Sequence, residues 1–68
     1  MPKFAEEVSL HDVIALRKTP AALVCLIENE EFLIPDSQIS DDSEVWKAGD
    51  KGTLIISQFI AEKKGLHE

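Results

Sequence analysis

The sequence contains little of what secreted and membrane proteins use for stability and anchoring. Cys25 is the single cysteine among 68 residues, so no disulfide can form within the chain. The longest uninterrupted apolar run, residues 21–27, is far shorter than the roughly 20 residues that span a bilayer as a helix. Glu6 and Glu7 stand where a secretion signal would have its apolar stretch. These absences predict a protein of the reducing cytosol with no membrane segment.

Motifs of known catalytic chemistry are also missing. Gly49 and Gly52 flank a turn, but the lysine and hydroxyl of a phosphate-binding loop do not accompany them. Ser37 lacks the neighbouring glycines that surround a hydrolase nucleophile. His11 and His67 are isolated, and together with one cysteine they make a poor zinc-binding set. We therefore expect no enzyme activity, no catalytic residue, no metal site and no cofactor.

Positive charge is scarce, and the imbalance lies in one segment. Seven Lys and Arg stand against thirteen Asp and Glu, which gives a formal charge of 7 − 13 = −6. Residues 1–27 sum to zero and residues 51–68 to +1, whereas residues 28–50 hold eight acids and one base, a sum of −7. Such a segment would repel a nucleic-acid backbone. It indicates either a set of solubilising loops or an acidic face that meets a basic partner.

Seven residues of this acidic middle segment are candidates for contact with a partner. Trp is enriched in interface hot spots, although the single Trp of a small domain can equally anchor its core. A calcium loop is not expected, because the acids lack the alternating spacing and the glycine turn of that motif. The candidates are Glu30, Glu31, Asp36, Asp41, Asp42, Glu44 and Trp46.

The apolar side chains of residues 8–17 alternate, which favours a half-buried strand. On this interpretation Leu10, Ile14 and Leu16 share one face and Asp12 interrupts the row. A helix is the competing interpretation, since some of the apolar residues are also spaced by three or four. The β-branched residues within the segment favour the strand.

Residues 22–27 are apolar on both faces, which is typical of a strand buried on two sides. Cys25, in the middle of this run, is expected to be a core side chain of low reactivity. A polar turn follows, in which Asn29 can adopt a positive φ. Residues 32–34 resume a strand that Pro35 ends, so the two strands form a hairpin.

The end of the chain is expected to form one more strand and a helix. Residues 53–56 are β-branched and apolar, which favours a strand. Ser57 can cap a helix over residues 58–64, and Gly65 stands where a left-handed residue ends one. Such a short helix must dock on the sheet through Phe59 and Ile60. Asp41 with Glu44 three residues later resembles a capping box, so a single helical or 3₁₀ turn is also expected there.

These elements predict a mainly-β fold with a short C-terminal helix. The sheet would be antiparallel, with four or five strands, and strongly curved or closed into a small barrel of the OB-like or Src-homology-3-like kind. Closure would protect sheet edges that so short a chain cannot otherwise cover. We expect one domain over residues 1–68, with a flexible start at 1–5 and a tail at 66–68.

Three segments resemble a family of very short proteins encoded by phages and mobile elements. Residues 31–39 read Glu-Phe-Leu-Ile-Pro-Asp-Ser-Gln-Ile, residues 52–56 read Gly-Thr-Leu-Ile-Ile, and residues 59–66 read Phe-Ile-Ala-Glu-Lys-Lys-Gly-Leu. The family has the pattern Trp-Ile-Pro-Lys-Ser-Gln-Ile, then Gly-Thr, then Trp-[Leu/Ile]-Ala-Glu-x-Lys-Gly-Leu. The resemblance covers about residues 21–66. It implies a small barrel and a mobile-element context, but no settled activity.

The chain departs from that family pattern at three positions. Leu33 and Phe59 stand where the family has Trp, and Asp36 stands where it has Lys. The last difference replaces a side chain that could contact phosphate with one that repels it.

Three functional hypotheses follow from these observations. The first is a non-enzymatic acidic binding module that acts through its acidic loops. It would be an inhibitor, adaptor or regulator of a host or phage protein with a basic surface, such as a host-defence complex. The second is an OB-like protein that binds single-stranded nucleic acid, which the negative charge disfavours. The third is a structural subunit that dimerises, because a core of this size rarely contributes more than about 3–5 kcal/mol.

Overall fold

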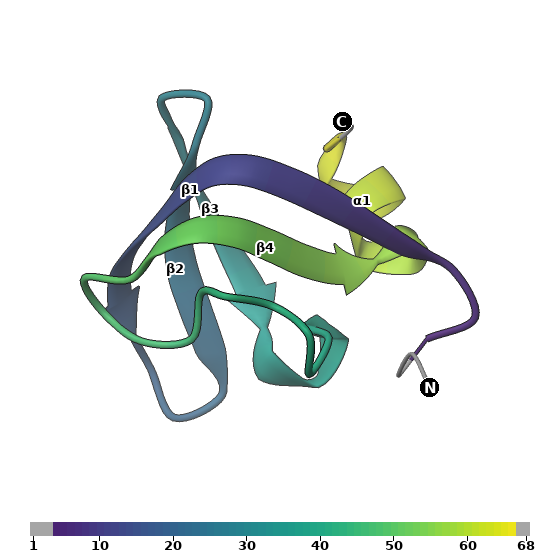
Figure 1. Cartoon of the computed structure of the whole chain (residues 1–68), viewed down its shortest axis with the longest axis horizontal. Helices are drawn as coiled ribbons and strands as arrows, with labels where there is room; N and C mark the ends of the chain where they lie inside the picture. Colours follow the sequence, from purple (N-terminus) through teal and green to yellow (C-terminus); the bar gives the residue numbers. More distant parts are fainter. Residues whose placement is uncertain (1–3, 67–68) are drawn as a thin grey trace.

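The computed structural model describes residues 4–66 and contains one antiparallel sheet and one short helix (Figure 1). The sheet has the strand order β3-β2-β1-β4, so the first strand lies inside it. This arrangement confirms the expected mainly-β fold with a C-terminal helix. The elements are β1 (Glu7–Lys18), β2 (Ala22–Ile27), β3 (Glu30–Pro35), the 3₁₀ turn η1 (Asp36–Gln38), β4 (Lys51–Ser57) and α1 (Gln58–Lys64).

At Asp12, the side chains of β1 exchange the faces of the sheet to which they point. This residue has a φ of 58°, a left-handed conformation that Asp tolerates better than most residues. The pairing of β1 with β4 shifts between Leu10 and Val13, so the following residues exchange faces. Leu10 and Val13 are both buried in the core. The expectation that Ile14 and Leu16 share the face of Leu10 is therefore wrong.

A second irregularity lies near the other end of β1. The pairing with β2 passes from Ala15 opposite Cys25 directly to Arg17 opposite Val24. Leu16 is therefore the extra residue of a bulge, and it is exposed. Because of this bulge, Arg17 lies on the outer face of the sheet beside Val24 instead of pointing into the core.

Strands β2 and β3 form the predicted hairpin. Glu28 and Asn29 have φ values of 51° and 68°, the pair of left-handed residues that a two-residue type I′ turn needs. From Ile27 opposite Glu30 onward, the two strands pair without a shift. The positive φ expected at Asn29 is confirmed, and Cys25 is fully buried as expected.

The chain between η1 and β4 returns along the outer edge of β4. Ile39 forms an isolated bridge with Ile56, and the amides of Ser40 and Glu44 donate to carbonyl groups of β4. In the opposite direction, amides of β4 donate to side-chain oxygens of Ser43 and Glu44. Within residues 4–66 an isolated bridge thus stands in place of the expected fifth strand. In Figure 1, β1 and β4 run across β2 and β3, and this strong curvature is consistent with the expected small barrel.

Helix α1 begins and ends at the predicted residues. The Ser57 hydroxyl oxygen accepts a hydrogen bond from the Ile60 amide at 3.3 Å. Gly65 has a φ of 73°, and the Leu66 amide donates to the Ala61 carbonyl at 2.7 Å, which is the geometry of a Schellman motif. Ile60, Ala61 and Leu66 are buried, so the helix covers part of the core.

Two expectations for the end of the chain are wrong. Phe59 does not dock on the sheet but is 67% exposed, because Ile60 and Ala61 occupy the one face of this short helix that can reach the core. Leu66, expected to begin a tail, belongs to the hydrophobic core. The rest of the expected flexible start and tail, residues 1–3 and 67–68, lies outside the described residues.

Candidate functional site

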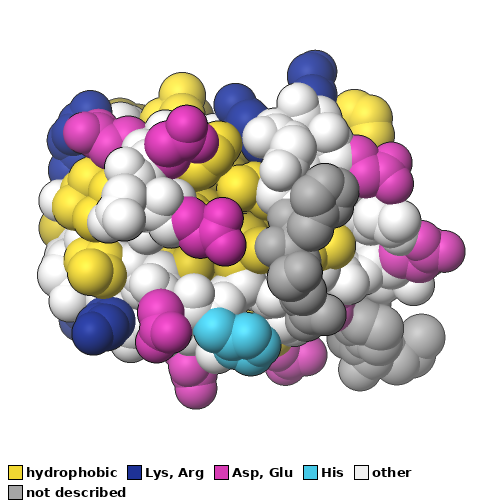
Figure 2. Space-filling model, turned by 90° about the horizontal axis from the view of Figure 1, so that it is seen from above, with side chains coloured by type: hydrophobic (Ala, Val, Ile, Leu, Met, Phe, Trp, Pro, Cys, Tyr) yellow, Lys and Arg dark blue, Asp and Glu magenta, His cyan; other side chains and the backbone are white. Residues whose placement is uncertain are grey.

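The acidic residues of the middle segment do not form one continuous patch. Glu30 and Glu31 begin β3, whereas Asp36 follows its other end, about 17 Å away along a strand of this length. Asp41 and Asp42 are exposed in the loop that returns along β4. Seen from above, several acidic side chains are spaced around hydrophobic surface (Figure 2). The clustering of charge along the sequence is therefore distributed in space.

Two basic residues of β1 reach acids on the β3 side. Arg17 Nη1 lies 3.6 Å from Glu31 Oε1, with both side chains more than half exposed. Lys18 Nζ lies 2.6 Å from Asp36 Oδ2. Exposed pairs of this kind contribute little to stability, but they partly neutralise two of the predicted site residues. Glu30 is exposed and has no such ion pair within residues 4–66.

Glu44 has a structural role. Its Oε1 atom accepts a hydrogen bond from the Thr53 amide at 2.9 Å. A Cβ atom at Gly52 would lie 2.7 Å from the same oxygen, so the missing side chain at Gly52 leaves room for the carboxylate. Glu44 therefore attaches the returning loop to β4 while its side chain stays exposed.

Trp46 is held in the same loop and is 38% exposed. Its indole Nε1 donates to the Ser43 carbonyl at 2.7 Å. The amides of Trp46 and Lys47 donate to Asp50 Oδ2 at 3.0 and 3.1 Å, and these two bonds lower the pKa of the Asp50 carboxyl. Trp46 is therefore neither fully in the core nor an isolated surface anchor.

The outer face of the sheet is an apolar surface that sequence reasoning missed. The registers of β1, β2 and β3 place five aliphatic side chains outside the core cluster on this face. They are Ile14, Leu16, Val24, Leu26 and Leu33. Leu33 is 51% exposed. The apolar run on both faces of β2 was the available signal, but only the strand register shows which neighbours flank it.

The side chains of Arg17 and Glu31 span this outer face. Arg17 extends from β1 and Glu31 from β3, which are separated by β2 and thus by about 10 Å. Their contact passes over β2 between the rows of Val24 and Leu26. Val24 is only 5% exposed although it lies outside the core cluster. Arg17 is opposite Val24 in the register, and its apolar stem is long enough to cover this valine.

Strand β3 has an edge that no described residue pairs with. Because a two-residue turn makes Ile27 and Glu30 a hydrogen-bonded pair, the backbone groups of Glu30 and of every second residue after it face β2. The N–H and C=O groups of Glu31 and Leu33 therefore point away from β2. This edge lies directly beside the apolar outer face.

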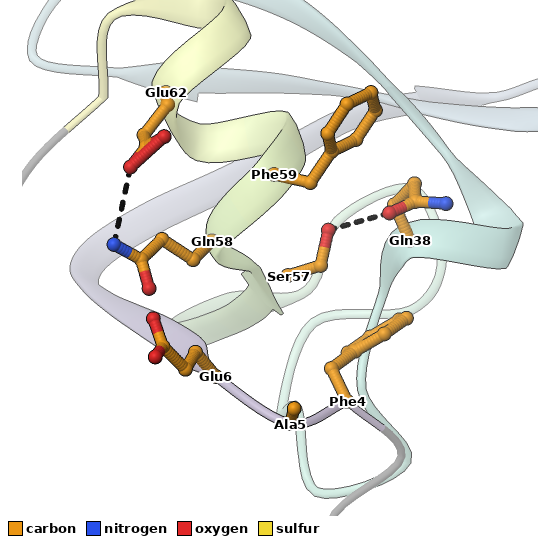
Figure 3. A pocket seen from close by; sticks show the side chains of 8 residues that line it. All are labelled: Phe4, Ala5, Glu6, Gln38, Ser57, Gln58, Phe59 and Glu62. Atoms are coloured by element: carbon orange, nitrogen blue, oxygen red, sulfur yellow. Dashed lines mark hydrogen bonds between the residues drawn. The ribbon is translucent and has the colours of Figure 1, made fainter.

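A groove of about 800 Å³ lies between the N-terminal segment and α1 (Figure 3). The rings of Phe4 and Phe59 lie on one side of it, together with Gln38 from η1. The carboxylates of Glu6 and Glu62 lie on the other side. The groove thus has an aromatic half and an acidic half.

Chemically reactive side chains are sparse in this structure. Within residues 4–66, no group of three or more His, Cys, Asp and Glu residues could hold a metal ion. His11 Nδ1 lies 3.2 Å from Thr53 Oγ1 on the surface. Burial raises the pKa of the Cys25 thiol to about 11, so little thiolate is present at neutral pH.

Comparison with protein-family models, with curated proteins and with solved structures finds no match to this chain. No helix within residues 4–66 is long and apolar enough to cross a membrane.

Proposed function

We propose that this protein is a non-enzymatic binding module that takes an extended, basic segment of a partner protein against strand β3. The observation that carries this proposal is the unpaired edge of β3 beside the exposed side chain of Leu33. An added strand would hydrogen-bond to the outward backbone groups of Glu31 and Leu33. Its alternate side chains would cover the exposed part of the apolar outer face, above all Leu33.

The charge around this edge favours a basic segment. Glu28, Glu30 and Glu31 are exposed at the hairpin end of β3, and Arg17 is the one base paired with them within the described residues. Lysine or arginine opposite these acids would gain electrostatic complementarity. Two copies of this chain, each with a formal charge of −6, would instead bring acids on both strands close together. A heterologous partner is therefore favoured over a homodimer at this edge.

The resemblance to short phage and mobile-element proteins supports a host or phage protein as the partner. In this proposal the module acts in the cytosol as an inhibitor, adaptor or regulator of that protein. Binding of single-stranded nucleic acid has less support. Arg17 and Lys18 pair with acids, and Lys63 and Lys64 lie at the end of α1, so these bases do not line one groove.

A peptide titration followed by NMR tests the proposal. The probes are a hexapeptide of alternating lysine and valine and its counterpart with glutamate in place of lysine. We expect the lysine peptide to shift the amide signals of Glu31 and Leu33 and to slow their hydrogen exchange. We expect the glutamate peptide to have no effect at the same concentration.

Two variants separate strand addition from a general charge effect. Leu33→Pro removes one outward N–H group while leaving the pairing with β2 intact, and edge strands tolerate such a proline. Leu33→Ala removes the side chain but keeps the N–H group. We expect Leu33→Pro to abolish protection of the edge and Leu33→Ala only to weaken binding. Equal peptide affinity in both variants, or saturable binding of oligothymidine by the unaltered protein, would overturn the proposal.

A further inference from the structure

The groove beside α1 has a floor fixed by hydrogen bonds. The Ser57 hydroxyl donates to Gln38 Oε1 and accepts from the Ile60 amide. This bond orients the Gln38 side chain so that its amide nitrogen is turned away from Ser57 (Figure 3). The floor therefore joins η1 to the start of α1.

The aromatic half of the groove combines a half-buried ring, Phe4, with an exposed ring, Phe59. Phe59 is 67% exposed, and Phe4 lies across from it. The Lys63 ammonium lies 5.7 Å from the centre of the Phe59 ring, a weak cation–π contact at an exposed site. An exposed aromatic side chain at the margin of a groove is typical of a place where an apolar group docks.

The acidic half is negatively charged and polar. Glu62 Oε2 accepts a hydrogen bond from Gln58 Nε2 at 3.1 Å, which positions this carboxylate on the wall. Glu6 contributes a second carboxylate, and no Lys or Arg is among the described residues that line the groove. The groove therefore complements a ligand that carries positive charge next to an apolar group.

We propose that this groove is a second recognition site that binds a protein segment with an apolar residue adjacent to an arginine or lysine. The apolar side chain lies between Phe4 and Phe59, and the basic side chain meets Glu6 and Glu62. A phosphate-bearing ligand is disfavoured, because it would face two carboxylates. This site is independent of strand β3 and of the function proposed for it.

The probe for this site is the tetrapeptide acetyl-Gly-Leu-Arg-Gly-amide, titrated into the folded protein by NMR. We expect the amide signals of Ala5, Gln58 and Phe59 to shift while those of Glu31 and Leu33 do not. The same peptide with citrulline in place of arginine keeps the shape and loses the charge. We expect it to bind about two- to fivefold more weakly, as for an exposed ion pair.

Three variants give the matched comparison. Glu62→Gln removes one carboxylate from the wall, and we expect about two- to fivefold weaker binding. Phe59→Ala removes the exposed ring without touching the core, and we expect about two- to tenfold weaker binding. Asp41→Asn removes the same charge from a residue outside the groove and is expected to leave the affinity unchanged.

Several outcomes would overturn the proposal of a second site. One is equal affinity for the arginine and citrulline peptides, and another is the same weakening by Asp41→Asn as by Glu62→Gln. A third is a set of shifts confined to Glu31 and Leu33, which would place the peptide on β3 and leave the proposed function standing. If neither the groove amides nor the β3 amides shift with the lysine and arginine peptides, both proposals are contradicted. Shifts at the groove amides alone would support the second site and contradict the function proposed for β3.

Discussion

Arg17 and Glu31 belong to strands that are not neighbours, yet their side chains meet 3.6 Å apart across the strand between them. The bulge at Leu16 makes this contact, because it turns Arg17 onto the outer face of the sheet. Val24 lies opposite Arg17 in the register and is only 5% exposed, as expected if the Arg17 stem covers it. Any partner that uses this face must displace or incorporate this pair.

Replacement of Arg17 tests how much of this covering is apolar. We expect Arg17→Ala to lower the free energy of unfolding by about 0.5–1 kcal/mol, through loss of both the exposed ion pair and the stem over Val24. Arg17→Met keeps most of the stem and loses the charge, so we expect a smaller loss. Urea titrations of both variants give the comparison, and equal losses would assign the effect to the charge alone.

The glycine at position 52 offers a test of the loop attachment. Gly52→Ala combines a φ of 152° with a contact of 2.7 Å to Glu44 Oε1. Gly49→Ala has a φ of 94° but nothing within 4 Å of the new Cβ, so it measures the backbone cost alone. We expect about 1–3 kcal/mol of destabilisation for Gly52→Ala and less for Gly49→Ala. Equal thermal destabilisation would show that Glu44 moves aside freely.

Loss of the helix cap has a predictable cost. Ser57 satisfies the Ile60 amide at the start of α1, and caps of this kind contribute about 1 kcal/mol. We expect Ser57→Ala to lose at least that amount, since Gln38 also loses its hydroxyl donor. Ser57→Thr retains the hydroxyl group and should retain most of the stability. A chemical denaturation series on both variants decides the point, and an unaffected Ser57→Ala would contradict it.

The buried thiol predicts a decline of stability in alkaline solution. Burial raises the pKa of Cys25 from 9.0 to about 11, so the folded state keeps its proton where the unfolded state releases it. The stabilisation that comes from burying the protonated thiol is fully present below pH 9 and is lost as the pH rises toward 11. A shift of this size corresponds to about 2–3 kcal/mol at full loss.

The matched variant for this effect is Cys25→Ala, which has no titrating group at this position. We expect its unfolding free energy to fall less between pH 9 and pH 11 than that of the unaltered protein, although its core packing is poorer throughout. Thiol labelling at pH 8 gives a second measurement and should be slow in the folded protein. Parallel pH profiles for the two proteins would refute the assignment.

The parts of the fold that could be predicted from the sequence are those with local signals. Ser57 and Gly65 mark the ends of α1 because capping and the left-handed conformation each select few residue types. Asn29 marks the hairpin turn for a similar reason. In each case, the residue type itself carries the geometric information.

The parts that could not be predicted depend on register. Asp12 breaks the alternation of β1, but a break alone does not show that the strand reverses its facing there. The position of Leu33 beside Val24 follows from the pairing of β2 with β3, and the proximity of Arg17 follows from a bulge. The acids are neighbours in the order of the chain, whereas β3 separates Glu31 from Asp36 by its length.

The loop from Ile39 to Glu44 gives the sheet two unlike flanks. Along the free edge of β4, the loop pairs with the strand through one bridge. The side-chain oxygens of Ser43 and Glu44 accept hydrogen bonds from two further β4 amides. At β3 the flank stays unpaired within the described residues. A further strand can therefore join the sheet only at β3, because the loop already covers the edge of β4. The expected stoichiometry is one strand per molecule, a terminating assembly that cannot propagate into a fibre.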